Sequence, residues 1–175
     1  RHAEDLGFDS VWVADHLVVP VETASLYPFD PRATPEPATL DGLVEFYEPL
    51  VTLAYLAAAT TRVRLGVSVY VLPYRNPVVT AKLVATLDAL SGGRVIFGAG
   101  VGWLREEFRA LGQDFETRGR RLDEMIEVMR KLWRGEMVEH HGEFFDFDLL
   151  RMRPAPIAPV PILLGGLHPK VLERA

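Results

Sequence analysis

Cysteine is absent from the 175 residues of this chain, which excludes disulfide bonds and thiolate metal ligands. A run of about 18 apolar residues, the length that a membrane span needs, is also missing, so we expect no membrane contact. Basic residues are not in excess, since 19 Lys and Arg stand against 24 Asp and Glu, and this argues against a nucleic-acid partner. The first residues show no signal-peptide pattern, so we expect a cytoplasmic protein.

The composition that is present, 49% hydrophobic and 25% charged, is typical of a globular protein, and the length predicts one domain over residues 1–175. The chain begins at Arg1 in what reads as a helix and ends inside another helical pattern, "HPKVLERA". We therefore expect a segment of a longer protein.

Short apolar strands alternate with helices along the chain. Strands are predicted at Ser10–Ala14, 62–72, 94–100 and 161–166, and helices from Pro49, over Pro77–Leu90, over Trp103–Leu111 and over 120–136. A long loop is predicted at 19–48, and an irregular excursion that includes a candidate hairpin at 135–160. This order predicts an α/β fold with a parallel sheet covered on both faces, either an open doubly wound sheet or part of a (β/α)8 barrel.

Two helices have apolar faces that predict the core. The helix over 120–136 places its apolar residues at helical spacing, which indicates core packing and not a cofactor site; these are Leu122, Met125, Ile126, Met129, Leu132 and Trp133. In the helix over Pro77–Leu90 the residues expected inward are Val78, Ala81, Leu83, Ala85 and Leu87.

The stretch "VIFGAGVGWLREEF" raises the question of a dinucleotide site, because glycines follow a strand and precede a helix. Trp103 stands where the third glycine of G-x-G-x-x-G belongs, and the region expected to hold a ribose-binding acid, 120–124, is helical. The dinucleotide interpretation therefore fails. The glycines either let the backbone approach a flat ligand or only permit a tight turn.

Six segments that follow one another in this order carry a resemblance to a known family: "VWVADH", "LGVSVYVLPYRNP", "GGRVIFGAGVGWLREEF", "RGRRLDEMIEVMRKLW", "HGEFFDF" and "PILLGG". The chain resembles the luciferase-like monooxygenase superfamily, most closely its branch that depends on coenzyme F-420, a deazaflavin. The resemblance implies a (β/α)8 TIM barrel, of which this chain would hold strands two to five. It also implies a cofactor at the carboxyl ends of the strands.

The resemblance implies a role for residues just past each strand. His16 would lie near the redox ring as the catalytic residue, able to donate a hydrogen bond or move a proton, although a loop-capping histidine is the alternative. Asp15 would orient His16 or cap the long loop. Ser68 and Val69 would form a bulge with a non-prolyl cis peptide against the ring. The further cofactor-binding residues are Gly100, Val101, Gly102 and Trp103, with Gly165, Gly166, Leu167 and His168 at the phosphate.

Three features need separate interpretation. Trp103 stands where the sugar-phosphate dehydrogenases of this superfamily have an acid, so that substrate is not assigned. Glu106 and Glu107 are interpreted as first-turn acids favoured by the helix dipole and not as catalysts. The pair "HH" at 140–141 lacks a third ligand at metal-site spacing, so no metal is expected.

The resemblance implies an oxidoreductase that transfers a hydride between coenzyme F-420 and a small organic substrate. Two alternatives stay open: an FMN-dependent monooxygenase that uses O2, and a non-catalytic flavin-binding relative. The full-length protein is expected to be a homodimer. Half a barrel would expose two unpaired strand edges, so we expect the isolated segment to be unstable or to pair through them.

Overall fold

A computed structural model describes residues 1–21, 23–27, 45–166 and 169–174. The loop expected at 19–48 is therefore described only at its two ends. Four strands form one parallel sheet in the order β1 (Ser10–Val13), β2 (Arg64–Val71), β3 (Val95–Gly100) and β6 (Ile162–Leu164). The predicted strands are confirmed in type and place, with each end shifted by no more than a few residues.

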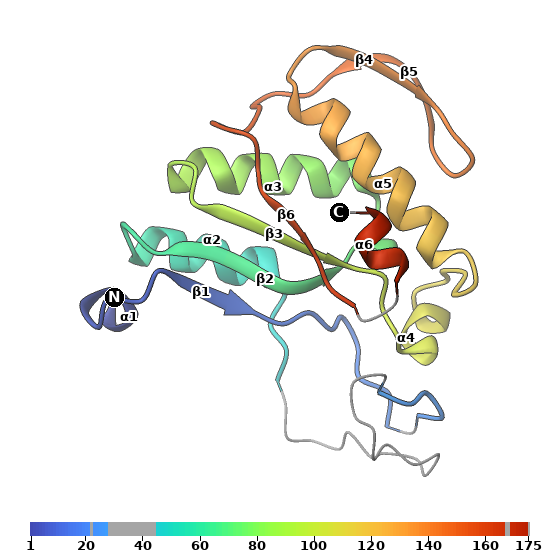
Figure 1. The fold of residues 1–175 in the computed structure, drawn as a ribbon, viewed down its shortest axis with the longest axis horizontal. Coiled ribbons are helices and arrows are strands. Elements are labelled where there is room, and N and C mark those ends of the chain that lie inside the picture. Colours follow the sequence, from blue (N-terminus) through green and yellow to red (C-terminus); the bar gives the residue numbers. More distant parts are fainter. Residues whose placement is uncertain (22, 28–44, 167–168, 175) are drawn as a thin grey trace.

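The strands lie in the sheet in the same order in which they follow one another along the chain, so each new strand is added at the same edge. Helices α2 (Pro49–Ala59), α3 (Pro77–Ser91) and α5 (Arg118–Trp133) lie together over one face of this sheet (Figure 1). A doubly wound sheet instead reverses its strand order near the centre and carries helices on both faces. The arrangement is therefore of the barrel type.

The expectation that helices cover both faces is wrong for the described residues. Val11 and Val13 pack into the core beneath the helices, and Trp12 alternates with them and points to the opposite face, where it is 41% exposed. The physical reason is that barrel strands turn one face to an outer helical layer and the other to the barrel interior.

Local signals determine where the long helices begin and end. Asn76 precedes α3, and its side chain accepts hydrogen bonds from the backbone N–H groups of Val78 and Val79. Gly92, with φ of 74°, ends the same helix in the left-handed conformation. Helix α2 begins with Pro49 after a glutamate cap. The shorter elements are α1 (His2–Asp5), the 3-10 turn η1 (Leu72–Tyr74), α4 (Arg105–Ala110) and α6 (Lys170–Arg174).

The core lies between the sheet and the three long helices, and α5 contributes as predicted: Leu122, Met125, Ile126, Met129 and Leu132 are buried and Trp133 is partly buried. In α3 the prediction for Leu83 is wrong, since its side chain is 47% exposed. A helix turns by about 100° per residue, so position 83 points away from the face that buries Ala81 and Ala85.

The segment 135–160 contains an antiparallel hairpin of β4 (Met137–His141) and β5 (Asp146–Arg151). His140 is buried there, with Nε2 3.1 Å from Glu124 Oε1 and Nδ1 3.1 Å from Lys131 Nζ, so it joins the hairpin to α5. In the part of the chain that the structure describes, no group of three potential metal ligands occurs. The described helices also include none long and apolar enough to cross a bilayer.

Candidate active site

A cleft of about 1770 Å³ opens at the carboxyl ends of the four parallel strands. Ten of the residues expected at a cofactor site line it together: Asp15, His16, Ser68, Val69, Gly100, Val101, Gly102, Trp103, Gly165 and Gly166. Leu167 and His168 lie outside the described residues. The ten residues converge because parallel strands all end at the same edge of a sheet, although along the sequence they are spread from Asp15 to Gly166. A cleft of this size has room for a cofactor together with a substrate.

His16 lines the cleft with one ring nitrogen bound to a buried carboxylate. Its Nδ1 lies 2.9 Å from Glu107 Oε2, and the His16 side chain is 19% exposed whereas that of Glu107 is fully buried. The same carboxylate accepts hydrogen bonds from the backbone N–H groups of Leu17 at 2.6 Å and Val18 at 3.2 Å. The Tyr74 hydroxyl donates the fourth bond, to Glu107 Oε2 at 2.8 Å.

These contacts determine the charge of Glu107. Burial by itself raises the pKa of this carboxyl group, but the hydrogen bonds from His16, Val18, Leu17 and Tyr74 outweigh burial and leave the pKa below its ordinary value. Burial and the negative charge of Glu107 raise the pKa of Tyr74, so the phenol stays protonated and donates. Because an ionised carboxylate only accepts hydrogen bonds, Nδ1 of His16 carries a proton. In the neutral imidazole the other nitrogen, Nε2, is then the acceptor.

The interpretation of Glu106 and Glu107 as first-turn acids of a helix is confirmed by their place, but it leaves out what these side chains bind. Both belong to the first turn of α4, but each binds a distant segment. Glu106 accepts hydrogen bonds from the backbone N–H of Ala24 at 2.8 Å and the Ser25 hydroxyl at 2.7 Å. Burial raises the pKa of Glu106, but bonds from Ser25 and the backbone bring it to about 2.

Among the described residues, Asp15 binds Val71 and Arg75 and makes no hydrogen bond to His16 or to the described ends of the long loop. Its carboxylate forms a two-point pair with the Arg75 guanidinium, with both N–O distances at 2.7 Å, and also accepts a bond from the Val71 N–H at 2.7 Å. Burial alone lowers the pKa of Arg75, but its contacts with Asp15 raise it above the ordinary value. The pair therefore joins β1 to the end of β2 beneath the cleft, and Asp15 is a structural anchor of the site.

The bulge expected in β2 is confirmed, because the Ser68–Val69 peptide is cis and the pairing with β3 shifts register between Val67 and Tyr70. Neighbouring glycines make room for this bulge. A Cβ on Gly98 would lie 2.1 Å from the Val67 carbonyl oxygen, and one on Gly100 would lie 2.3 Å from Val69 Cγ2. The explanation of these glycines by close approach to a planar ring is thus incomplete, since the chain itself occupies the space that they leave.

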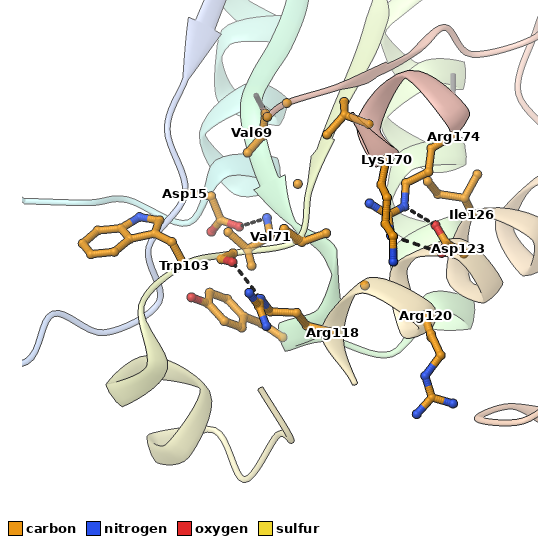
Figure 2. A pocket seen from close by; sticks show the side chains of 18 of the residues that line it. Asp15, Val69, Val71, Trp103, Arg118, Arg120, Asp123, Ile126, Lys170 and Arg174 are labelled. Atoms are coloured by element: carbon orange, nitrogen blue, oxygen red, sulfur yellow. Dashed lines mark hydrogen bonds and ion pairs between the residues drawn. The ribbon is translucent and has the colours of Figure 1, made fainter. Parts of the chain in front are cut away.

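Arg118, at the start of α5, binds the backbone of the segment that follows β3 at the cleft wall. The Arg118 Nε donates to the Gly102 carbonyl at 3.3 Å, and its guanidinium lies 3.6 Å from the centre of the Phe115 ring. Figure 2 shows the Trp103 indole on one side of the cleft and Lys170 and Arg120 on the other.

The wall formed by α5 and α6 is rich in basic side chains. Seven basic residues line it against four acidic ones (Glu116, Asp123, Glu127 and Glu173). The basic residues are Arg118, Arg120, Arg130, Lys131, Arg134, Lys170 and Arg174. Some of this charge is paired, since Arg174 binds Asp123 and Lys131 lies 2.8 Å from Glu127. The excess favours an anionic group in this part of the cleft.

The arrangement combines a proton-transfer group with an anion-attracting wall. His16 can take a proton at Nε2 while Glu107 stabilises the imidazolium that forms, as a buried carboxylate does in other carboxylate–imidazole pairs. Sequence reasoning missed Glu107, Tyr74 and Arg75 as parts of the site. Their only local signal is position, because each follows closely after a strand that ends at the cleft.

A family model described as luciferase-like monooxygenase matches residues 1–175. The uncharacterized protein Rv0940c of Mycobacterium tuberculosis is 41% identical over 175 residues, which cover 100% of this chain and 60% of the relative. An F420-dependent glucose-6-phosphate dehydrogenase of Kineococcus radiotolerans is 37% identical over 177 residues, which cover 99% of this chain and 47% of that protein.

Among solved structures, an F420-dependent secondary alcohol dehydrogenase in complex with an F420–acetone adduct superposes with a TM-score of 0.73 at 26% identity. The match covers 97% of this chain and 47% of the dehydrogenase. The chain thus spans 60% of the length of the first relative and about half that of the two dehydrogenases.

Proposed function

This chain belongs to the luciferase-like monooxygenase family, and we propose that it carries the cofactor site of an oxidoreductase that moves a hydride between coenzyme F-420 and a small organic substrate. Two named relatives use this coenzyme, one on glucose 6-phosphate and one with an acetone adduct. We further propose that β1, β2, β3 and β6 are strands two to five of an eight-stranded barrel, supported by their one-way order and common helical face.

The residues of the cleft fit such a coenzyme. The volume of about 1770 Å³ exceeds the roughly 300–1,000 Å³ of a pocket for one drug-sized ligand. Gly100 and Gly165 lie against Val69, and these three residues with Ser68 line the cleft and would face the ring. The basic wall of α5 and α6 would hold the anionic tail, and Gly165, Gly166, Leu167 and His168 stay the proposed site of its phosphate. When bound, the deazaflavin supplies a ring carbon that accepts or releases a hydride.

The observation that carries the proposal is the buried Glu107 that holds His16 Nδ1 at 2.9 Å beside this cleft. With Nδ1 protonated, Nε2 of His16 accepts the proton that leaves a substrate hydroxyl as its carbon gives up a hydride. In the reverse direction the imidazolium returns that proton to a carbonyl oxygen. Glu107 stabilises the charged ring in both directions.

Cofactor binding tests the choice of F-420, and turnover tests the role of His16. The full-length protein is expected to bind F-420 in a spectroscopic titration and to bind FMN more weakly. A protein that binds FMN tightly and has no affinity for F-420 would overturn this choice in favour of an FMN-dependent monooxygenase. His16→Ala is expected to keep F-420 bound and to lose turnover; unchanged turnover would point to a non-catalytic role for His16.

Sugar phosphate is not proposed as the substrate, because Trp103 stands where the resemblance to sugar-phosphate dehydrogenases implies an acid. The homodimer expected for the full-length protein stays a prediction, which its molecular mass in solution tests.

A further inference from the structure

Four aromatic rings from separate segments meet at the His16 end of the cleft. The His16 and Phe46 ring centres lie 4.8 Å apart at 63°, and those of Tyr27 and Trp103 lie 5.2 Å apart at 71°. The His16 and Trp103 rings are 6.3 Å apart at 85° and connect the two pairs. All four residues line the cleft. These distances and angles are those of edge-to-face aromatic contacts.

Hydrogen bonds position the segment that supplies Tyr27. Glu106 binds Ala24 and Ser25, and the Ser25 hydroxyl oxygen in turn accepts a bond from the Arg105 N–H at 3.1 Å. Residues 23–27 are thereby attached to the start of α4, two residues after Trp103. The aromatic wall is therefore built by specific polar contacts and not by random collapse of a loop.

The aromatic end of the cleft presents no unpaired negative charge among the described residues. The Asp15 carboxylate is bound to Arg75, and neither Glu106 nor Glu107 lines the cleft. Figure 2 shows Lys170, Arg120 and Arg174 on the far side of the cleft from Trp103. Arg118 lies nearer to Trp103, but its Nε donates to the Gly102 carbonyl and its guanidinium stacks on the Phe115 ring. A substrate with a phosphate or carboxylate would have to leave that charge desolvated against Trp103 and Phe46, which is unfavourable.

We infer that His16, Tyr27, Phe46 and Trp103 form the substrate subsite, and that it takes the uncharged cyclic or aromatic part of an alcohol or the corresponding carbonyl compound. This inference rests on the proposed function. The substrate oxygen lies at His16 Nε2. In the oxidation, the C–H bond of the carbinol carbon breaks and its hydride reduces F-420. The hydroxyl proton passes to His16, and the substrate leaves as the carbonyl compound.

Calorimetry on the F-420-loaded full-length protein tests the subsite with three probes: benzyl alcohol, 4-(hydroxymethyl)benzoate and glucose 6-phosphate. Benzyl alcohol is expected to bind at least about tenfold more tightly than either anion, because the ring buries apolar surface and the charge loses its water. Tighter binding of either anion than of benzyl alcohol would overturn the inference.

Substitution of Trp103 tests whether benzyl alcohol binds at the aromatic surface. Trp103→Ala is expected to weaken benzyl alcohol about tenfold, as loss of a central aromatic contact does. Trp103→Phe keeps a ring and is expected to lose no more than about threefold. Trp12→Phe is the matched control, since Trp12 does not line the cleft. Unchanged affinity in Trp103→Ala, or equal loss in the control, would refute the assignment. If Trp103→Ala does not fold, Tyr27→Ala replaces it with the same expectation.

The F-420 titration separates this inference from the proposed function. If F-420 binds and benzyl alcohol does not, the aromatic subsite is wrong and the cofactor assignment stands. If F-420 does not bind but benzyl alcohol binds through Trp103, the proposed function fails and the aromatic surface remains a site for uncharged ligands.

Discussion

Replacement of Glu107 by glutamine is expected to move the proton on His16 from Nδ1 to Nε2. In the native protein, Oε1 of Glu107 accepts from the Leu17 and Val18 N–H groups and Oε2 faces His16 Nδ1 and the Tyr74 hydroxyl. A glutamine must keep its oxygen toward the two backbone N–H groups, which can only donate. Its NH2 group then faces His16 Nδ1, and this nitrogen has to accept.

The expected loss of stability follows from the hydrogen bonds that the Glu107 carboxylate makes. The substitution removes a buried charge that serves four hydrogen bonds, and bonds to a charged group contribute about 1.5–3 kcal/mol each against about 0.5–1.5 for neutral ones. With partial compensation, we expect the free energy of unfolding to fall by about 2–4 kcal/mol. In the exchanged tautomer Nε2 of His16 carries a proton and no longer accepts one. The same exchange in a catalytic triad lowers kcat about 10⁴-fold, so a loss of about 10²–10⁴-fold is expected here.

Nitrogen NMR of ¹⁵N-histidine-labelled protein measures the tautomer directly and needs no substrate. Only 5 histidines have to be resolved in this segment, and a His16→Gln variant assigns the signal. Glu106→Gln is the matched control, because Glu106 binds Ala24 and Ser25 and does not touch His16. The reasoning is refuted if His16 keeps its proton on Nδ1 in Glu107→Gln, or if the control moves the proton equally.

Three further outcomes are expected. Gly100→Ala should lower the free energy of unfolding in urea by about 1–3 kcal/mol, because the new methyl group would overpack against the bulge of β2; Gly119→Ala on α5 meets only a flexible side-chain end at 3.1 Å and should be neutral or slightly stabilising. Asp15→Asn should cost about 3–5 kcal/mol in the same assay, because Arg75 loses its buried partner, and a cost under 1 kcal/mol would contradict the anchoring role. The pKa of Glu107 is lower in the folded protein than in the unfolded chain, so the ionised carboxylate stabilises the fold. This stabilisation is fully present above the pKa of about 4.3 that a glutamate has in the unfolded chain, and it is lost as pH falls through the lower pKa of the folded protein. The melting temperature should therefore drop in acid, and less steeply in Glu107→Gln; identical pH profiles would contradict this.

Much of the fold could be predicted from local patterns. The buried face of α5 follows from apolar residues at helical spacing, and the ends of α3 follow from Asn76 and Gly92. Such signals act within a few residues, so a sequence displays them directly. Leu83 shows the limit, because an apolar residue does not have to lie on the buried face of its helix. The rotation of about 100° per residue places position 83 opposite Ala81 and Ala85.

The convergence of the cleft residues could also be predicted, because strands of a parallel sheet bring their ends together whatever side chains they carry. The pattern of strands and helices by itself could not decide between a doubly wound sheet and a barrel-type sheet, although the resemblance to the luciferase-like superfamily implied the barrel. Both architectures read as apolar strands alternating with helices, and only the strand order and the side on which α2, α3 and α5 pack distinguish them.

The sequence by itself determined the elements, the sheet edge that holds the site and the presence of His16 at that edge. Only the tertiary structure decided what each polar group does there. Glu107 reaches His16 across 91 residues, and Asp15 turns to Arg75, 60 residues away. Hydrogen bonds depend on distances of about 3 Å and on direction. Those quantities arise from how the segments pack against one another, and no local spacing along the chain records them.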